Sequence, residues 1–146
     1  MKKIFFSVLA IILLMQFFKP YFTNPKIDER IALHADEKVM TLLKQSCFDC
    51  HSNETIYPWY HHIAPVSWIM KDHIDEGREA LNFSTWANIN ADTRLTRMKR
   101  AKQLVDNGLM PLGSYAWMHQ KSHLNQADKE TLDHFFEQQI KQLQTF

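Results

Sequence analysis

The sequence predicts an all-α fold, and two observations support this prediction. Apolar residues recur at spacings of three and four along several segments, as they do on the buried face of a helix. Only 3 glycines and 5 prolines occur in 146 residues, whereas a chain of many short strands and turns would be richer in both. We therefore expect one small helical domain that follows an N-terminal apolar helix.

The first 22 residues are predicted to form a membrane anchor. Lys2 and Lys3 precede an uncharged, mostly apolar run, Ile4–Phe18, which is the arrangement of an export signal. The run reaches the roughly 17 to 25 residues of a membrane span only when it is extended to Phe22. No small-x-small cleavage site follows it, so we expect residues 1–22 to remain as a signal anchor. With the lysines inside, the protein would be a single-pass protein of a bacterial inner membrane whose remaining residues face the periplasm.

The remainder of the chain divides into a linker, residues 23–28, and one domain, residues 29–146. Asn107 and Gly108 form a helix stop, and Asn125 can cap the last helix. Four helices are expected in the domain, over residues 29–46, 65–81, 92–106 and 126–143.

The charge of the chain excludes one class of partner. The net charge is +1, and it becomes −2 when Lys2, Lys3 and Lys19 of the N-terminal segment are left out. Binding to nucleic acid needs a concentrated basic surface. We therefore expect no nucleic-acid partner.

Cys47-Phe48-Asp49-Cys50-His51 is the motif that points to a cofactor. C-x-x-C-H is the attachment signature of c-type haem, in which each thiol bonds one vinyl group and the histidine binds the iron. The chain has 2 cysteines, too few for an iron–sulfur cluster or for the usual two-pair zinc site. A thioredoxin-like motif would need a βαβ context, and a disulfide within the pair would leave His51 unexplained. The motif therefore predicts one covalent haem c held by Cys47, Cys50 and His51.

Several stretches beyond the motif itself match one protein family. The stretches are Cys47–Thr55, Tyr57–Tyr60, Ile63–Trp68, Glu76–Arg78, Leu81–Ser84, Met110–Leu112 and Ser114–Tyr115, together with the C-terminal helix. In these stretches the sequence resembles a bacterial haem-binding domain family with a single C-x-x-C-H motif. The resemblance implies an exported protein with one haem. The order of helix, motif, Met-Pro loop and terminal helix is also similar to that of a class I cytochrome c, which implies a small cytochrome c-like helical domain around the haem.

Met110 is the first candidate for a second protein ligand to the iron, which electron-transfer haems usually have. Residues 108–120 are expected to form a loop after the third helix, and Pro111 stiffens the backbone beside Met110. A thioether on such a loop can approach the face of the haem opposite the first ligand. His73 and His119 are the rival ligands, and an open sixth position is a further alternative.

Other residues are candidates for contacts with the haem. Trp59, Trp68 and Tyr115 can pack on the ring or donate to a propionate, and an ordinary core role explains them equally well. Arg78 can pair with a propionate, with a solvated helix face as the alternative. The cations that crowd the third helix can steer an acidic redox partner or form its solvated side. These cations are Arg94, Arg97, Lys99, Arg100 and Lys102.

These observations favour a membrane-anchored, periplasm-facing monohaem cytochrome that passes single electrons between redox partner proteins. No pattern of nucleophile and base suggests a substrate pocket, so we expect the protein not to be an enzyme. The alternative is a peroxidase-like haem enzyme or a gas sensor, which needs an open sixth position with His73 or His119 nearby. A structural haem within a larger complex is a third hypothesis, and the sequence favours no particular oligomeric state.

Overall fold

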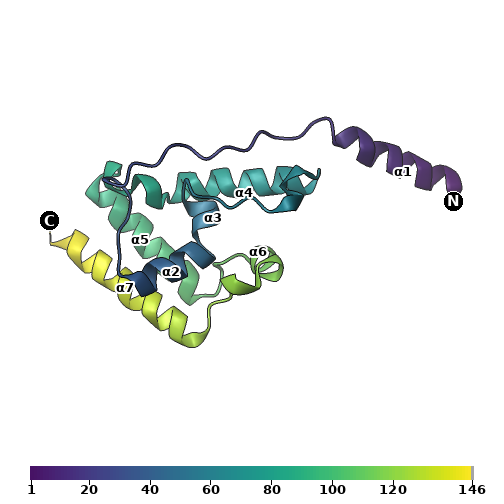
Figure 1. Cartoon of the computed structure of the whole chain (residues 1–146). Coiled ribbons are helices and arrows are strands. Elements are labelled where there is room, and N and C mark those ends of the chain that lie inside the picture. Colours follow the sequence, from purple (N-terminus) through teal and green to yellow (C-terminus); the bar gives the residue numbers. More distant parts are fainter. Residues whose placement is uncertain (146) are drawn as a thin grey trace.

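The computed structural model describes residues 1–145, and these residues form helices joined by turns and extended segments, with no strand among them. In Figure 1, α4 runs across the top of the domain, α5 and α7 lie below it, and α1 projects away from the domain. The all-α prediction is confirmed. The elements in chain order are α1 (Lys2–Met15), α2 (Glu37–Ser46), α3 (Phe48–His51), η1 (Trp59–His62), α4 (Val66–Ala80), η2 (Phe83–Asn88), α5 (Ala91–Asp106), α6 (Gly113–Met118), η3 (Gln120–Ser122) and α7 (Gln126–Gln144).

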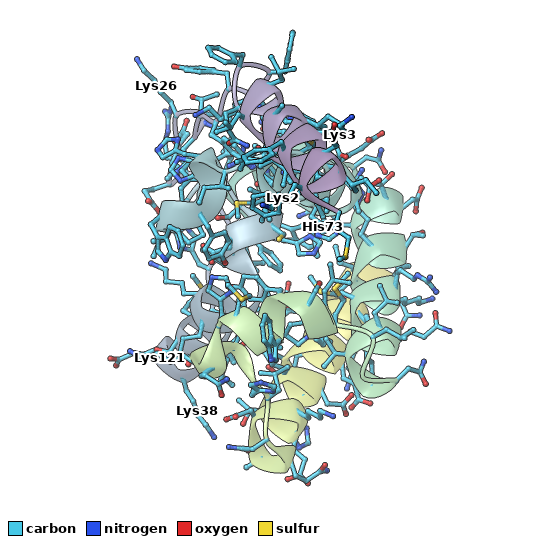
Figure 2. All side chains as sticks on the ribbon, turned by 90° about the vertical axis from the view of Figure 1, so that its right-hand side faces the viewer. Lys2, Lys3, Lys26, Lys38, His73 and Lys121 are labelled. Atoms are coloured by element: carbon cyan, nitrogen blue, oxygen red, sulfur yellow. The ribbon has the colours of Figure 1, made fainter. Side chains whose placement is uncertain are left out.

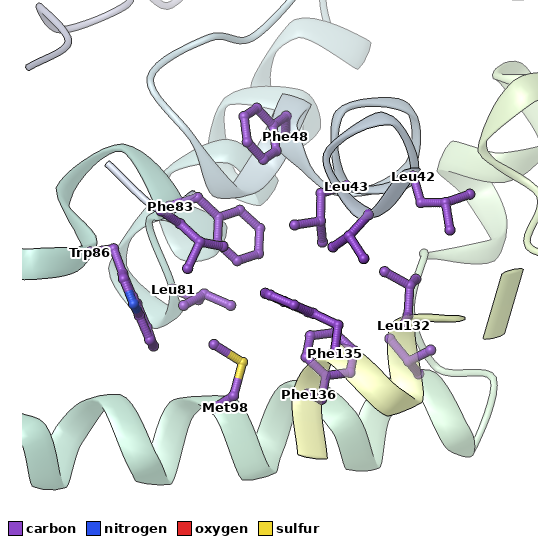
Figure 3. Packing of buried hydrophobic residues seen from close by; sticks show 13 residues of the cluster. Leu42, Leu43, Phe48, Leu81, Phe83, Trp86, Met98, Leu132, Phe135 and Phe136 are labelled. Atoms are coloured by element: carbon purple, nitrogen blue, oxygen red, sulfur yellow. The ribbon is translucent and has the colours of Figure 1, made fainter. Parts of the chain in front are cut away.

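The apolar core lies where α2, α5 and α7 meet η2 (Figure 3). Leu43, Met98 and Phe136 are each no more than 2 % exposed. Phe48 of α3 stacks on Phe83 of η2 with ring centroids 5.4 Å apart. Since burial of such side chains is the main favourable term in folding, this core holds α3, and with it the C-x-x-C-H motif, against the larger helices.

The first helix of the domain is shorter than the predicted range 29–46, because α2 begins at Glu37. The Asp36 side chain accepts a hydrogen bond of 2.9 Å from a backbone amide of the first turn and so caps the helix. The residues before it pair with η2 instead, through a 2.7 Å bond from the Leu33 amide to Phe83 O. The predicted start was wrong because apolar spacing does not reveal a partner that is distant in the sequence.

Two other predicted helix ends agree with the structure. α7 starts with a capping box in which the Asn125 and Asp128 side chains each accept from the other residue's amide. α5 ends at Asp106, and Gly108 then adopts a φ of 66°, a left-handed conformation that glycine takes without strain. Both predictions are confirmed.

The predicted loop of residues 108–120 is shorter than expected. Met110 lies in the loop that joins α5 to α6, as predicted, but residues 113–118 form α6 and η3 follows it. α6 has 6 residues and no side-chain cap, so the sequence carries little signal for it. This short helix matters for the site because it carries Tyr115.

The N-terminal helix ends at Met15, so the predicted helix through Phe22 is not formed. α1 has 14 residues, and within residues 1–145 no helix is both long enough and apolar enough to cross a membrane. Pro20 has no amide hydrogen with which to continue a helix. The Gln16 side chain binds the Ala64 backbone through hydrogen bonds of 3.0 and 3.1 Å, which ties the end of α1 to the domain.

The segment after α1 runs beside α4 (Figure 1). Trp68 Nε1 of α4 donates to Phe18 O at 2.6 Å. Asn24 Nδ2 donates to Thr55 O at 2.9 Å. Residues 23–28, predicted as a linker, therefore begin in direct contact with the domain.

Candidate functional site

Cys47 joins α2 to α3, and Cys50 lies within α3. The Cys47 amide donates to Leu43 O at 2.8 Å, and Cys47 O accepts from the His51 amide at 2.9 Å, which closes the turn of α3. Cys47 and Cys50 are free thiols. Burial, with repulsion between the two sulfur groups, raises the pKa of Cys47 to about 12. Burial and the nearby Asp49 carboxylate raise the pKa of Cys50 to about 11, so both thiols carry their protons.

The His51 ring is held by two backbone acceptors at the end of α4. Its Nδ1 lies 2.9 Å from Gly77 O and 3.0 Å from Leu81 O. Since a carbonyl oxygen only accepts, Nδ1 carries the proton and the lone pair of Nε2 remains free for a metal. Burial lowers the pKa of His51, and the neutral ring is the form that binds metal ions. The fold itself therefore orients the ring of this predicted iron ligand.

Close packing at Gly77 fixes α3 against α4. A Cβ atom at this position would lie 2.5 Å from Cys50 O, a separation that real side chains do not adopt. The next residue, Arg78, donates to Ser52 O at 2.8 Å and to Thr55 Oγ1 at 2.9 Å. Arg78 thus holds the segment after the motif, a role that neither the propionate hypothesis nor the solvated-face alternative foresaw.

Three adjoining cavities lie beside the motif. The first, of about 300 Å³, is lined by Cys47, Cys50, His51 and Met110 among others. The second, of about 250 Å³, shares Cys47, His51 and Met110 with the first and extends to α5. The third, of about 290 Å³, shares Cys50 with the first and extends between α4 and α6. Their linings are mainly apolar, and we call the three together the motif cavity.

Two of the predicted iron ligands line the motif cavity with His51. Met110 lines both cavities that His51 lines. His73 of α4 lines the first and third cavities. In Figure 2 the His73 ring lies near the centre of the view, close to the space above the green helix α6. The structure therefore brings both side chains to the same space as the motif.

His119 also lines the third cavity, but its ring has other partners. Its ring stacks on that of Tyr115 with centroids 4.1 Å apart, and its Nδ1 lies 3.0 Å from Tyr115 O. Its Nε2 lies 3.4 Å from the Tyr60 hydroxyl. Both ring nitrogens of His119 are thus engaged, which makes it a weaker candidate ligand than His73.

The donor set of the motif cavity fits a c-type haem. Two free thiols and an imidazole with a free Nε2 line one apolar space. A family model described as a haem-binding domain matches residues 10–138. The chain belongs to this haem-binding domain family. The predicted family is confirmed, and comparison with curated proteins and with solved structures gives no match.

The three predicted aromatic contacts of the haem-binding domain lie in different places. Tyr115 lines two of the cavities, and its hydroxyl donates to Asp49 Oδ2 at 2.7 Å. Burial and this hydrogen bond raise the pKa of Tyr115. Trp59 is 77 % exposed on η1, and Trp68 donates to the extended segment at Phe18. Of the three, the structure places Tyr115 beside the motif.

The sequence did not reveal some residues that position the C-x-x-C-H motif. Asp49 accepts from the Tyr115 hydroxyl and from the Ile56 amide at 2.8 Å, and so joins α3 to α6. Gly77 and Leu81 bind the His51 ring through their backbone oxygens, and a pattern of side chains cannot predict such contacts. The available signal was indirect, because Gly77 and Leu81 both lie in stretches that carried the family resemblance.

Proposed function

We propose that this haem-binding domain is a c-type cytochrome that transfers single electrons, with one haem attached covalently through Cys47 and Cys50. The observation that supports this most is the His51 ring, whose Nδ1 is fixed by two carbonyl oxygens beside both free thiols. The haem would supply the one-electron redox chemistry. The chain supplies the two thiols, the first ligand and an apolar enclosure, and these set the potential.

Met110 is the proposed second iron ligand. It lines the two cavities that His51 lines, and it packs at the edge of the apolar core. It also lies in the loop between α5 and α6. A methionine at this position gives a higher reduction potential than a histidine does.

Redox partner proteins are proposed to dock where the third cavity reaches the surface. Ile56, Ile69, Trp117 and Met118 line this cavity and are strongly exposed. Exposed apolar side chains that gather around a cavity are typical of a contact surface. A partner bound there would lie next to the haem-binding motif, since Cys50 lines the same cavity.

Residues 1–22 are proposed to attach the domain to a bacterial inner membrane, with the domain in the periplasm. α1 exposes apolar side chains along its length, including Ile4 at 70 % and Leu14 at 60 %. Lipid would cover such a surface, with Lys2 and Lys3 at the polar side. The protein should remain in the membrane fraction after carbonate washing, and its intact mass should include these residues. A mature N-terminus near residue 23 would show instead that the segment is a cleaved signal.

Haem staining after denaturing electrophoresis tests the covalent attachment. The wild-type chain should give a stained band, because thioether bonds survive denaturation. The Cys47→Ala/Cys50→Ala double variant should give none, because neither thioether can form. A stained band that persists in the double variant would refute the attachment.

Carbon monoxide distinguishes the electron carrier from a gas-binding or peroxidase-like protein. Electron transfer is supported if the reduced haem is six-coordinate and its visible spectrum does not change when carbon monoxide is added. Rapid binding of the gas would indicate an open iron position. His73 would then be the nearby polar group, because it lines the first cavity together with His51. The function would then be the gas-binding or peroxidase-like alternative.

A further inference from the structure

We propose that Arg97 and Arg100 of α5 bind the two propionate carboxylates of the haem, an inference that rests on the proposed haem c. Both side chains line the second cavity, the one of about 250 Å³ that Cys47 and His51 also line. The Arg97 guanidinium makes no hydrogen bond or ion pair with the other residues of 1–145, and Arg100 Nη1 donates to Gln103 at 2.9 Å. Their remaining donors are available to a ligand in that cavity.

The other cations of α5 have different positions. Arg94 lies over the Trp86 ring, with its guanidinium carbon 5.8 Å from the ring centroid. Lys102 pairs with Asp133 of α7 and so links the two helices. Lys99 is exposed. The basic run of α5 is therefore not uniform, because only its middle part, at Arg97 and Arg100, reaches the cavity.

The other charged side chains around the motif cavity also favour the α5 side as the place for an anion. Glu76 lines the first cavity and Asp49 the third, and a carboxylate in either place would be repelled. Arg78 is already engaged by Ser52 O and Thr55 Oγ1. The α5 side is thus the part of the lining where cations can meet a negatively charged ligand.

The chemistry of the haem requires such partners. The two propionates lie on the ring edge away from the vinyl groups, which the cysteines hold. A carboxylate that enters an apolar cavity without a partner loses the stabilisation of water. A guanidinium presents a planar fork of donors that matches a carboxylate with two parallel hydrogen bonds. Two arginines one turn apart on α5 can therefore serve two propionates.

The reduction potential of the haem-loaded protein gives the first test. Arg97→Gln and Arg100→Gln should each lower the potential, and the double variant should lower it further, because a cation near the iron disfavours its oxidised form. Arg97→Lys keeps the charge and should restore most of the loss. Lys99→Gln is the matched control, since it removes the same charge from a position of α5 that does not line the second cavity, and it should leave the potential unchanged. An equal fall in the Lys99 variant would overturn the proposal.

Titration of the unloaded Cys47→Ala/Cys50→Ala chain gives the second test, with haem and haem dimethyl ester as the two probes. Arg97→Gln should weaken binding of haem about tenfold, the effect expected for loss of a hydrogen bond to a charged group, and leave binding of the ester unchanged. Equal weakening for both probes would mean that Arg97 only supports the cavity and would overturn the proposal. Absence of covalent haem from the wild-type protein would instead contradict the proposed function.

Discussion

The two walls of the motif cavity are built in different ways. The wall formed by α3 and α4 is fixed by backbone contacts, with His51 Nδ1 bound to two carbonyl oxygens and Gly77 packed against Cys50 O. The facing wall, formed by the α5–α6 loop and α6, brings Met110 and Tyr115 to the same cavity. Among residues 1–145, one side-chain hydrogen bond joins this wall directly to α3, and in it the Tyr115 hydroxyl donates to Asp49.

This difference assigns the walls different tasks. The α3–α4 wall sets the position of the proposed first ligand before a haem is present, since its contacts need no cofactor. The α5–α6 wall carries the proposed second ligand on a short loop, in which the Met110 amide donates to Leu104 O at 3.2 Å. We call the α3–α4 wall the first wall and the α5–α6 wall the second wall. A break in the first wall should therefore affect folding and haem attachment, whereas a change in the second wall should affect mainly the properties of the haem.

Gly77→Ala should have the largest effect, because it breaks the first wall. The new Cβ would meet the backbone oxygen of Cys50 at 2.5 Å, and backbone cannot rotate away as a side chain can. We expect a loss of about 3 kcal/mol in the free energy of unfolding, the upper end for overpacking, and a lower yield of attached haem. Denaturant unfolding and haem staining measure the two effects.

Gly113→Ala is the matched control for this prediction. A Cβ at Gly113 meets no atom within 4 Å, and the residue is the first of α6. Its free energy of unfolding should stay the same or rise by about 0.5 kcal/mol, since alanine loses less chain entropy on folding. Equal losses in the two variants would mean that the contact between Gly77 and Cys50 does not control the first wall.

The sequence predicted the first wall better than the second, for a physical reason. Cys47, Cys50 and His51 are close in sequence, so their spacing alone places them together in one turn. The contacts that orient them, from Gly77 and Leu81, arise from packing of α3 on α4 and left only an indirect signal. The start of α7 after Asn125 and the end of α5 before Gly108 could be predicted, because the residues that cap a helix are its neighbours in sequence.

The second wall depends on contacts that are distant in sequence. The loop position of Met110 was predicted from Gly108 and Pro111, but α6 was missed because it is short and uncapped. The pairing of Asp49 with Tyr115 joins residues 66 positions apart. No local sequence pattern could predict this pairing, although both residues belong to stretches that resemble the haem-binding domain family.

Met110→Ala should change the haem without releasing it, because it alters the second wall only. The proposed covalent bonds to Cys47 and Cys50 would stay intact, so haem staining should persist. Loss of the thioether should lower the reduction potential and remove the weak absorption band of ferric iron–sulfur ligation near the infrared edge. Spectroelectrochemistry measures both.

Met70→Ala is the control for the Met110 variant. Met70 also lines the motif cavity, but in the third cavity, which His51 does not line. It should keep the potential and the sulfur band. If Met110→Ala leaves both unchanged and His73→Ala alters them, the second ligand is His73 and the assignment of Met110 is wrong.

Tyr115→Phe should have the smallest effect, because it removes one hydrogen bond between the walls and keeps the ring. The lost partner is the Asp49 carboxylate, which still accepts from the Ile56 amide. We expect a loss of about 1 to 2 kcal/mol in the free energy of unfolding, since hydrogen bonds to charged groups are stronger than neutral ones and Tyr115 is half-buried. Covalent haem should be retained in full.

Tyr60→Phe makes this last prediction sharper. The Tyr60 hydroxyl lies 3.4 Å from His119 Nε2, a long contact between neutral groups, so its removal should cost less than about 0.5 kcal/mol. Denaturant unfolding of both variants beside the wild type measures the difference. If the two variants lose the same free energy, the bond between Tyr115 and Asp49 does not join the walls. The position of α6 would then depend on apolar packing alone.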